Sequence, residues 1–540
     1  MKASHTAPAP FVDATHSIDD DTLSVVLEHI EDVALVDSMR TCAQFACCAA
    51  RVLRERHHLE SHQLVAYVAA LLGKNVFITG GGGCGKSFVS RLIVAAARER
   101  MGEAAVVVCA PTGLAAAAVG GITLDRVMGT RKVRARWQTG VMSFEDFQLL
   151  TNAPDEEEEE EEEGGTPTGI GEVFAPVHSH FAGQRLSAVR TILIDEVSMV
   201  SAAKLELLFA VLVHYGVNWK KVQFVCVGDF AQLKPICPKK SPEATALRGG
   251  FFAFRSPIWA KLRLVPAPLS VNRRCTHPKW NECLARLRKG EWDDSLLQGI
   301  RDLTVTPVPI AEAAIAKAAT AGWVGIFSRN EDVNNFNCLA LQKRPGVLRK
   351  VLAQDTPTSW GAVPQRLPAT LRLKVGCSVL VTRNLPNQLY NGAMGKVTAD
   401  IDAVNGLRDG VWVAFDSDAV SPQRIGAFVD QKTYKRNNMV EEGERRQIPL
   451  QFAAAFTVHK AQGRSISDPL LVDASTFWME SGMFYVALSR TTNPSILAIV
   501  GLNDAKAYID PKVQSFHLSL EARPLPRWAR DEMENVVTVG

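Results

Sequence analysis

The chain has 540 residues, of which 47% are hydrophobic and 22% are charged, as in globular proteins with several domains. Its formal net charge is +3, but a run of eight glutamates, Glu156–Glu163, hides a basic remainder that carries +11. A basic body suits a phosphate-rich partner, although a solvated charged surface would give the same balance.

The sequence also argues against a zinc-binding, a membrane-spanning and a secreted protein. The eleven cysteines include no C-x-x-C pair, so a zinc-ligand pattern is missing and reduced thiols in an intracellular protein are expected. The uncharged stretch 104–124 contains Pro111, Gly120 and Gly121, which would break a membrane-spanning helix. The N-terminus lacks the layout of a signal peptide. We therefore expect a soluble intracellular protein, nuclear if its host is a eukaryote.

Residues 1–16 are expected to be a disordered tail. Residues 17–56 are predicted to be helical, because Leu23, Leu27 and Ile30 lie on one face of a helix.

From about residue 57 onward, and clearly after Lys74, short apolar runs alternate with helix-length segments. The runs are Val76–Ile78, Val106–Cys109, Ile192–Ile194 and Val222–Val227. This alternation predicts a parallel, doubly wound α/β sheet, and ligands bind such sheets at the ends of the strands.

Two segments interrupt this alternation of apolar runs and helices. An insertion at about 130–182, with an acidic loop at 155–163, interrupts the first α/β region, which ends near 265. A second α/β region is expected at 266–370 and 440–512. Between its two parts, the short alternating runs of 371–439 predict a small inserted β-barrel. Residues 513–540 are expected to form a loose C-terminal tail.

The most specific motif follows the first of these strands. Residues 80–87 read GGGGCGKS, which fits G-x-x-x-x-G-K-[ST] between a strand and a helix. The backbone N–H groups of such a loop and the N-terminus of its helix bind phosphates. Lys86 would neutralise the β- and γ-phosphate oxygens, and the Ser87 hydroxyl would bind Mg²⁺. The loop residues are Gly80, Gly81, Gly82, Gly83, Cys84, Gly85, Lys86 and Ser87.

Two further strands end in residues that complete a triphosphate site. The strand 191–194 ends in Asp195 and Glu196, and we expect Asp195 to hold Mg²⁺ and Glu196 to polarise the attacking water. The strand 222–227 is followed by GDFAQLKP, in which the Gln232 amide is suited to sense the γ-phosphate or the water.

These motifs, in this order, resemble those of superfamily 1 DNA helicases of the PIF and RecD branch. The resemblance extends from about Leu59 to Lys512. Its further motifs are APTGLAA at 110–116, TVHKAQG at 457–463 and YVALSR at 485–490. SRN at 328–330, NG at 391–392 and the stretches 251–259 and 284–290 also fit.

The resemblance implies two RecA-like P-loop domains, each with a parallel doubly wound sheet, that bind ATP and Mg²⁺ between them. It implies that Arg273 and Arg490 are arginine fingers and that Gln63 reads the adenine. Thr112, His459 and Lys460 would contact the backbone of single-stranded or forked DNA, and movement would be 5′-to-3′.

The chain departs from the family pattern at three places. Arg273 is followed by Arg274, where the family has glutamine, so either arginine could be the finger. Cys84 replaces a common threonine, and a partly exposed thiol beside Lys86 would have a lowered pKa and oxidise readily. The acidic run lies where the family has a small insertion, as a solvated linker or as a mimic of DNA.

Residues 17–51 faintly resemble an F-box, an adaptor that binds ubiquitin-ligase scaffolds, and a helical extension packed on the motor explains them equally well. The leading interpretation is an ATP-dependent DNA helicase in replication, recombination or repair. The alternatives are a ubiquitin-ligase adaptor, for which 17–56 would bind the scaffold, and a translocase that does not separate strands. The intact Lys86, Asp195 and Glu196 disfavour an inactive motor.

Overall fold

The computed structural model describes most of the chain between residues 52 and 521. The described residues are 52–128, 186–235, 252–305, 311–356, 368–383, 385, 389, 391–398, 410–415, 423–426, 428–436, 439–475, 480–503 and 507–521. Residues 1–72 and 525–540 form one compact unit, and 73–524 form another. In the first unit, helix α4 (Ser61–Leu71) is the element that positions Gln63.

The first sheet of the larger unit is parallel throughout, in the order β3-β2-β4-β5-β1-β6. Its strands are β1 (Val76–Gly80), β2 (Val106–Ala110), β3 (Ile122–Thr123), β4 (Thr191–Ile194), β5 (Gln223–Val227) and β6 (Val265–Leu269). The predicted doubly wound sheet is confirmed. Because β6 pairs along its whole length with β1, the sheet continues past the domain boundary predicted at 265.

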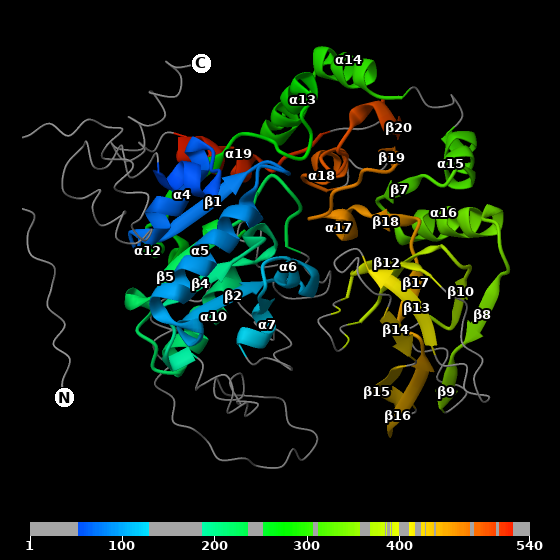
Figure 1. Ribbon diagram of the computed structural model, residues 1–540, viewed down its shortest axis with the longest axis horizontal. Helices are drawn as coiled ribbons and strands as arrows, with labels where there is room; N and C mark the ends of the chain where they lie inside the picture. Colours follow the sequence, from blue (N-terminus) through cyan, green and yellow to red (C-terminus); the bar gives the residue numbers. More distant parts are fainter. Residues whose placement is uncertain are drawn as a thin grey trace, which may run out of the picture. The chain divides into compact units, whose positions relative to one another are not determined.

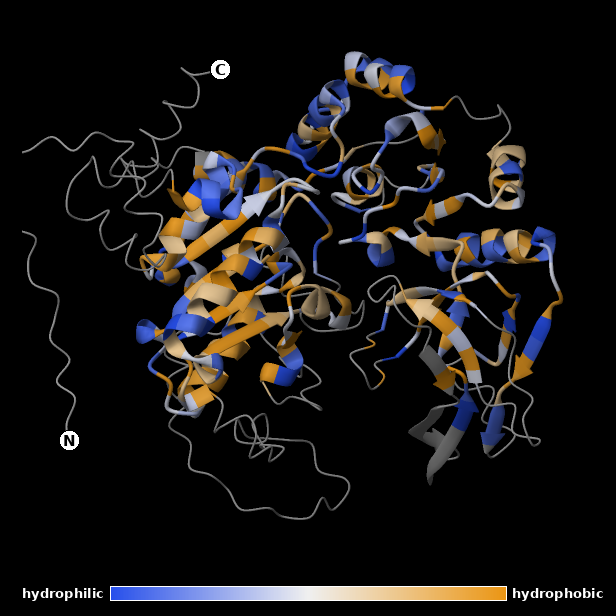
Figure 2. Ribbon diagram, in the orientation of Figure 1, coloured by the Kyte–Doolittle hydropathy of each residue, from blue (hydrophilic) through white to orange (hydrophobic). Residues whose placement is uncertain are grey.

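The helices of this region are short except for two. They are α5 (Lys86–Met101), α6 (Gly113–Ala118), α7 (Leu124–Val127), α10 (Ala202–His214) and α12 (Pro257–Leu262), with 3-10 turns at Glu103–Ala105, Val197–Met199, Trp219–Lys221 and Ala253–Arg255. The central strands are mostly apolar, as Figure 2 shows, which is typical of strands that helices cover on both faces (Figure 1). Phe77, Phe224 and Phe230 fill the core between sheet and helices.

The second parallel sheet has the order β18-β7-β19-β20. Its strands are β7 (Val324–Phe327), β18 (Ala455–Thr457), β19 (Leu470–Asp473) and β20 (Leu497–Val500). The associated helices are α13 (Pro278–Lys289), α14 (Asp294–Leu303), α15 (Ala311–Thr320), α16 (Asn330–Lys343), α17 (Val458–Ala461) and α18 (Met483–Leu488), with a 3-10 turn at Pro494–Ile496. The chain therefore has the predicted pair of P-loop-type sheets.

Antiparallel sheets stand where the sequence predicts a small β-barrel. They have the orders β14-β13-β12-β11-β17, β15-β16-β9 and β10-β8. The strands are β8 (Arg349–Leu352), β9 (Gln354–Thr356), β10 (Thr370–Leu373), β11 (Ser378–Val381), β12 (Met394–Val397), β13 (Gly410–Phe415), β14 (Gln423–Gly426), β15 (Phe428–Arg436), β16 (Met439–Gln447) and β17 (Leu450–Phe452). Pairing with β8, β9 and β17 extends this region beyond the predicted limits of 371 and 439.

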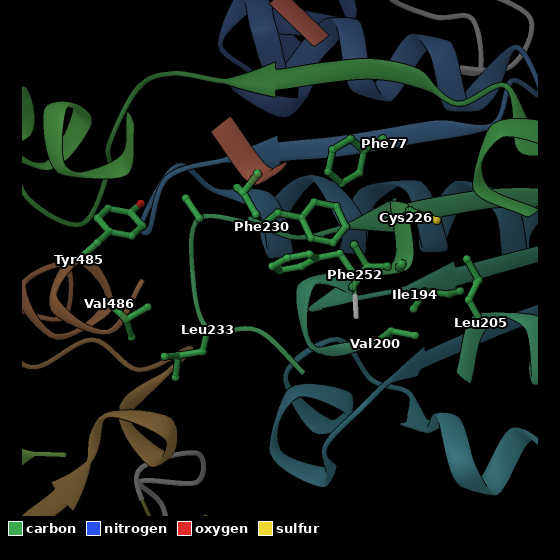
Figure 3. Packing of buried hydrophobic residues seen from close by; sticks show 14 of the residues in the cluster. Phe77, Ile194, Val200, Leu205, Cys226, Phe230, Leu233, Phe252, Tyr485 and Val486 are labelled. Atoms are coloured by element: carbon green, nitrogen blue, oxygen red, sulfur yellow. The ribbon is translucent and has the colours of Figure 1, made fainter. Parts of the chain in front are cut away.

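The predicted C-terminal tail contains a packed helix, α19 (Pro511–Glu521). Phe516 of this helix stacks on Phe254 with ring centroids 4.2 Å apart, and it also contacts Phe77 and Phe230 of the first sheet's core. Figure 3 shows Phe77 and Phe230 side by side at this place. The chain thus returns from the second sheet to the first.

Some predictions fall outside the described residues. They are the tail 1–16, the F-box-like stretch 17–51 and the acidic run 156–163 with most of its insertion. The other domain limits remain predictions. None of the helices in the described part is long and apolar enough to cross a membrane.

Candidate nucleotide and nucleic-acid site

The phosphate loop connects β1 to α5, and its glycines are required by its backbone. Gly83 and Gly85 have φ of +88° and +82°, in the region that side chains disfavour. A Cβ at Gly80 would lie 2.3 Å from the Leu269 carbonyl oxygen, because β6 runs alongside. Side chains at these positions would therefore strain the loop or clash with β6.

Lys86 begins α5 and folds back over the loop. Its Nζ donates hydrogen bonds to the carbonyl oxygens of Gly80, at 2.7 Å, and Gly81, at 2.9 Å. Ser87 follows it, half-buried in the first turn of α5. A cation beside a glycine-rich loop at the N-terminus of a helix is an arrangement that binds phosphate.

Asp195 and Glu196 follow β4, the strand paired with β5 and β2. Burial, and next to it the charge of Glu196, raises the pKa of the Asp195 carboxyl to about 7. A buried carboxylate with this pKa favours a bound cation, and a Mg²⁺ ion would be held by one or two such groups together with phosphate oxygens. Glu196 has φ of +49°, a costly backbone conformation for a residue with a side chain.

Gln232 lies in the loop after β5 and is buried. Its Nε2 donates to Asp229 Oδ2 at 3.4 Å, and its backbone N–H donates to the Asp229 carbonyl at 2.9 Å. The residue predicted to sense the γ-phosphate is therefore held in place by Asp229.

Arg490 reaches the phosphate loop from the end of α18. A Cβ at Gly82 would lie 3.0 Å from Arg490 Nη2 and 2.9 Å from Arg274 Nη1, so both guanidinium groups lie against that glycine. Burial, and then the neighbouring Arg274, lowers the pKa of Arg490 to about 9. Two adjacent guanidiniums in a buried position are stabilised by a bound anion.

The two central arginines contact the phosphate loop in different ways. Arg274 donates to the Ser489 carbonyl, at 2.7 Å, and to Ser465 Oγ, at 2.7 Å. Arg273 is exposed, and its backbone N–H, at 2.8 Å from the Gly83 carbonyl, is what touches the loop. The guanidinium of Arg274 therefore lies beside that of Arg490 at Gly82, and which of Arg273 and Arg274 is the finger remains a prediction.

The predicted reactivity of Cys84 is wrong. Its side chain is 4% exposed, and burial raises the pKa of the thiol despite the nearby Lys86 and Arg288 charges. A buried thiol with a raised pKa carries little thiolate and reacts slowly. The loop backbone encloses the residue.

The three residues predicted to contact DNA lie on two short helices. Thr112 is the N-cap of α6, and its Oγ1 accepts from Ala115 N at 3.2 Å. His459 and Lys460 lie on α17, where Lys460 is exposed and His459 Nε2 lies 3.3 Å from Glu480 Oε2. Gly392 lies near both helices: it packs beside Leu114 of α6 and accepts a hydrogen bond from Arg464, which follows α17.

Gln63 is the fourth residue of a capping box on α4. Its Oε1 accepts a hydrogen bond from Glu60 N at 3.1 Å. The smaller unit that contains it is described by itself, so reading of the adenine by Gln63 remains a prediction.

The sequence motifs do not predict several contacts that form only when the chain folds. Gln462 Nε2 donates to Glu196 Oε2 at 3.1 Å, and Tyr485 Oη accepts from Gly82 N at 3.0 Å. Arg288 Nε donates to Asp229 Oδ1 at 3.0 Å. All these residues lie within quoted motifs or stretches, but their partners are up to 403 positions away along the chain.

Comparisons with known proteins agree on one kind of relative. A family model described as "AAA domain" matches residues 63–238. The ATP-dependent DNA helicase PIF1 of Emericella nidulans is 24% identical over 515 residues, covering 85% of this chain and 62% of that protein. The ATP-dependent DNA helicase Pif1 of Bdellovibrio bacteriovorus is 26% identical over 505 residues, covering 90% of this chain and 100% of that protein.

A solved structure has the same fold. Pif1 helicase from Bacteroides, in complex with ADP-AlF3 and ssDNA, superposes with a TM-score of 0.62 at 22% identity. The match covers 86% of this chain and 97% of that chain.

Proposed function

We propose that this chain, a PIF1-type helicase in sequence and fold, hydrolyses ATP to move along single-stranded DNA and separate the strands of a duplex. Movement would be 5′-to-3′, and the work would lie in DNA replication, recombination or repair.

One observation carries the ATPase part of this proposal. Cations from both motor domains converge on a single phosphate loop: Lys86 from the first sheet, Arg490 from α18 and Arg274 from the segment between the domains. Positive groups crowded at this distance repel one another. A triphosphate bound by the loop amides would neutralise all three at once.

Each predicted residue then has a role that its position supports. Ser87 and Asp195 would hold Mg²⁺, which would polarise the phosphates, and Glu196 would orient and accept the proton of the attacking water. Arg490 and Arg274 would stabilise the charge of the transition state, and both leave the loop if the domains separate. Hydrolysis would therefore depend on domain closure.

The DNA-binding part rests on α6 and α17. Exposed Lys460 and the hydroxyl of Thr112 are suited to phosphates, and His459 would contribute when it exchanges Glu480 for the strand. Contacts to phosphates give affinity without reading bases, as movement along any sequence requires. The Bacteroides relative's structure contains single-stranded DNA.

An unwinding assay tests the function. Duplexes with a 5′ tail, a 3′ tail or a fork are incubated with ATP and Mg²⁺, and strand separation is followed. We expect unwinding of the 5′-tailed and forked duplexes, no ATP turnover by Lys86→Ala, and retained DNA binding by that variant. A wild-type chain that consumes no ATP in the presence of single-stranded DNA refutes the proposal.

Two finer predictions concern residues 17–56 and the cell. Binding of a ubiquitin-ligase scaffold through 17–56 is tested by a pull-down with the full chain and with a variant that starts at residue 57. A nuclear location, for a eukaryotic host, is tested by imaging a tagged chain.

A further inference from the structure

The Asp229 carboxylate lies at the centre of a buried group of polar side chains beneath the sensor loop. Oδ1 accepts from Arg288 Nε at 3.0 Å and from Ala231 N at 3.3 Å. Oδ2 accepts from Gln232 Nε2 at 3.4 Å and from Tyr485 Oη at 3.2 Å. Asp229 is fully buried, so its charge must be compensated by these donors.

Arg288 supplies the compensating charge. It lies at the C-terminal end of α13, the helix that follows the crossing from the first sheet to the second. Its Nη2 also donates to Thr79 Oγ1 of β1 at 3.4 Å. Burial raises the pKa of Asp229 less than the charges of Arg288 and Lys86 lower it, and the net pKa is below the usual range. The pair is therefore ionised.

Tyr485 connects this pair to the phosphate loop. Its hydroxyl donates to Asp229 and accepts the N–H of Gly82, the glycine whose α-carbon the Arg274 and Arg490 guanidinium groups lie beside. Burial raises the pKa of the phenol well above its usual range, so the hydroxyl remains a donor. Figure 3 shows Tyr485 and Val486 of α18 near Leu233 of the sensor loop.

A second contact between α18 and the sensor loop is steric. Gly482 is the N-cap of α18 with φ of +77°, and a Cβ there would lie 2.4 Å from the Ala231 carbonyl oxygen and 2.6 Å from that of Gln232. The second domain thus presses directly on the loop that carries Gln232. A displacement of α18 must move Tyr485 and the sensor together.

We propose that Arg288 and Tyr485 are positioning residues that, through Asp229, hold the Gln232 sensor and the phosphate loop in register with the second motor domain. This inference rests on the proposed ATPase function. Neither residue touches the reacting atoms; each fixes groups that do. Their contribution is made when the domains close, so it belongs to turnover more than to ATP binding.

The test compares three arginine variants in the full chain. Arg288→Gln removes the charge, and Arg288→Lys keeps it with a shorter reach. Arg286→Gln is the matched control, because Arg286 lies two residues earlier on α13 and pairs with Glu291 and Asp293 on the exposed side.

We expect Arg288→Gln to lower the DNA-stimulated kcat by about tenfold or more, with the KM for ATP within about twofold of wild type. Arg288→Lys should recover part of the loss, and Arg286→Gln should stay within about twofold. Thermal unfolding and single-stranded DNA binding are measured for every variant.

Tyr485→Phe is the second variant, since it deletes one hydroxyl and preserves the packing if Arg288→Gln does not fold. It should lower kcat in the same way, and the double variant should lose less than the product of the two single losses. The inference would be overturned if kcat were unchanged in both Arg288→Gln and Tyr485→Phe, or if only KM changed. It would also be overturned if Arg288→Lys recovered nothing, or if the two losses were fully independent. A wild-type chain without ATPase activity overturns the proposed function instead.

Discussion

The side-chain amide of Gln462 donates a hydrogen bond of 3.1 Å to the carboxylate of Glu196, from the end of α17 to the loop after β4. Gln462 Oε1 is buried without a hydrogen-bond partner among the described residues. The same helix carries Lys460, a residue predicted to contact DNA. A movement of α17 on DNA binding would therefore shift Glu196, the carboxylate that we propose activates the water.

Replacing this amide should weaken the effect of DNA on ATP turnover. In Gln462→Leu the side chain keeps a similar size but leaves Glu196 without its donor, so we expect the stimulation of ATPase by single-stranded DNA to fall about tenfold. DNA affinity should change less than about twofold. Gln298→Leu, an exposed glutamine on α14 bonded to Asp302, is the control. If single-stranded DNA stimulated the ATPase of Gln462→Leu and Gln298→Leu equally, Gln462 would not have this role.

Glu196→Gln tests the water-activating role itself. The amide preserves the shape of the side chain but cannot accept a proton, so hydrolysis should fall by about a hundredfold or more, in line with the loss of a general base. ATP binding should persist. Single-turnover hydrolysis and filter binding separate the two quantities, and a normal kcat would show that another group activates the water.

Acid should destabilise the chain through His517. Burial, and then the charge of Arg288, lowers the pKa of this histidine to about 4. The unfolded chain, with a pKa near 6.5, binds the proton more tightly, so stability present above about pH 6.5 is lost as the pH falls towards 4. His517→Gln stays neutral, and its thermal midpoint should fall less than that of wild type between pH 7 and pH 5. If the thermal midpoints of wild type and His517→Gln fell equally with pH, the assignment of this effect to His517 would be contradicted.

Phe516→Ala should loosen α19 from the first motor domain. The ring stacks on Phe254 and is half-buried in an aromatic cluster, so we expect a loss of about 2 kcal/mol in the free energy of unfolding. Leu518→Ala on the same helix is the control, because Leu518 is 65% exposed and should cost less than about 0.5 kcal/mol. Denaturant titration measures both, and equal losses would mean that α19 packs differently.

The sequence predicts best what one contiguous segment determines. The phosphate loop, Asp195 and Glu196 follow apolar strands, and strand and motif together specify where their side chains lie. The two parallel sheets follow from the same alternation of apolar runs. The short antiparallel strands were predicted as a group but not in their limits, because β8 and β17 are defined by partners distant in the chain.

The rest depends on three-dimensional packing that no local pattern encodes. Arg273 and Arg274 are adjacent, and the direction of each side chain follows from the turn after β6. Cys84 is buried by the loop around it, which the neighbouring Lys86 gives no sign of. Phe516 lies in the predicted tail, because the sequence around this short helix does not show that its ring packs among aromatic residues from distant parts of the chain.

Because the chain returns to the first sheet through α19, the second motor domain is attached to the first at both of its ends. The outgoing anchor is β6, and the incoming anchor is the Phe516 cluster. A domain attached at two points can rotate about the line that joins them, but it has no free end that could move outward. We therefore predict that a movement of the second sheet's domain relative to the first sheet is a rotation about these two anchors.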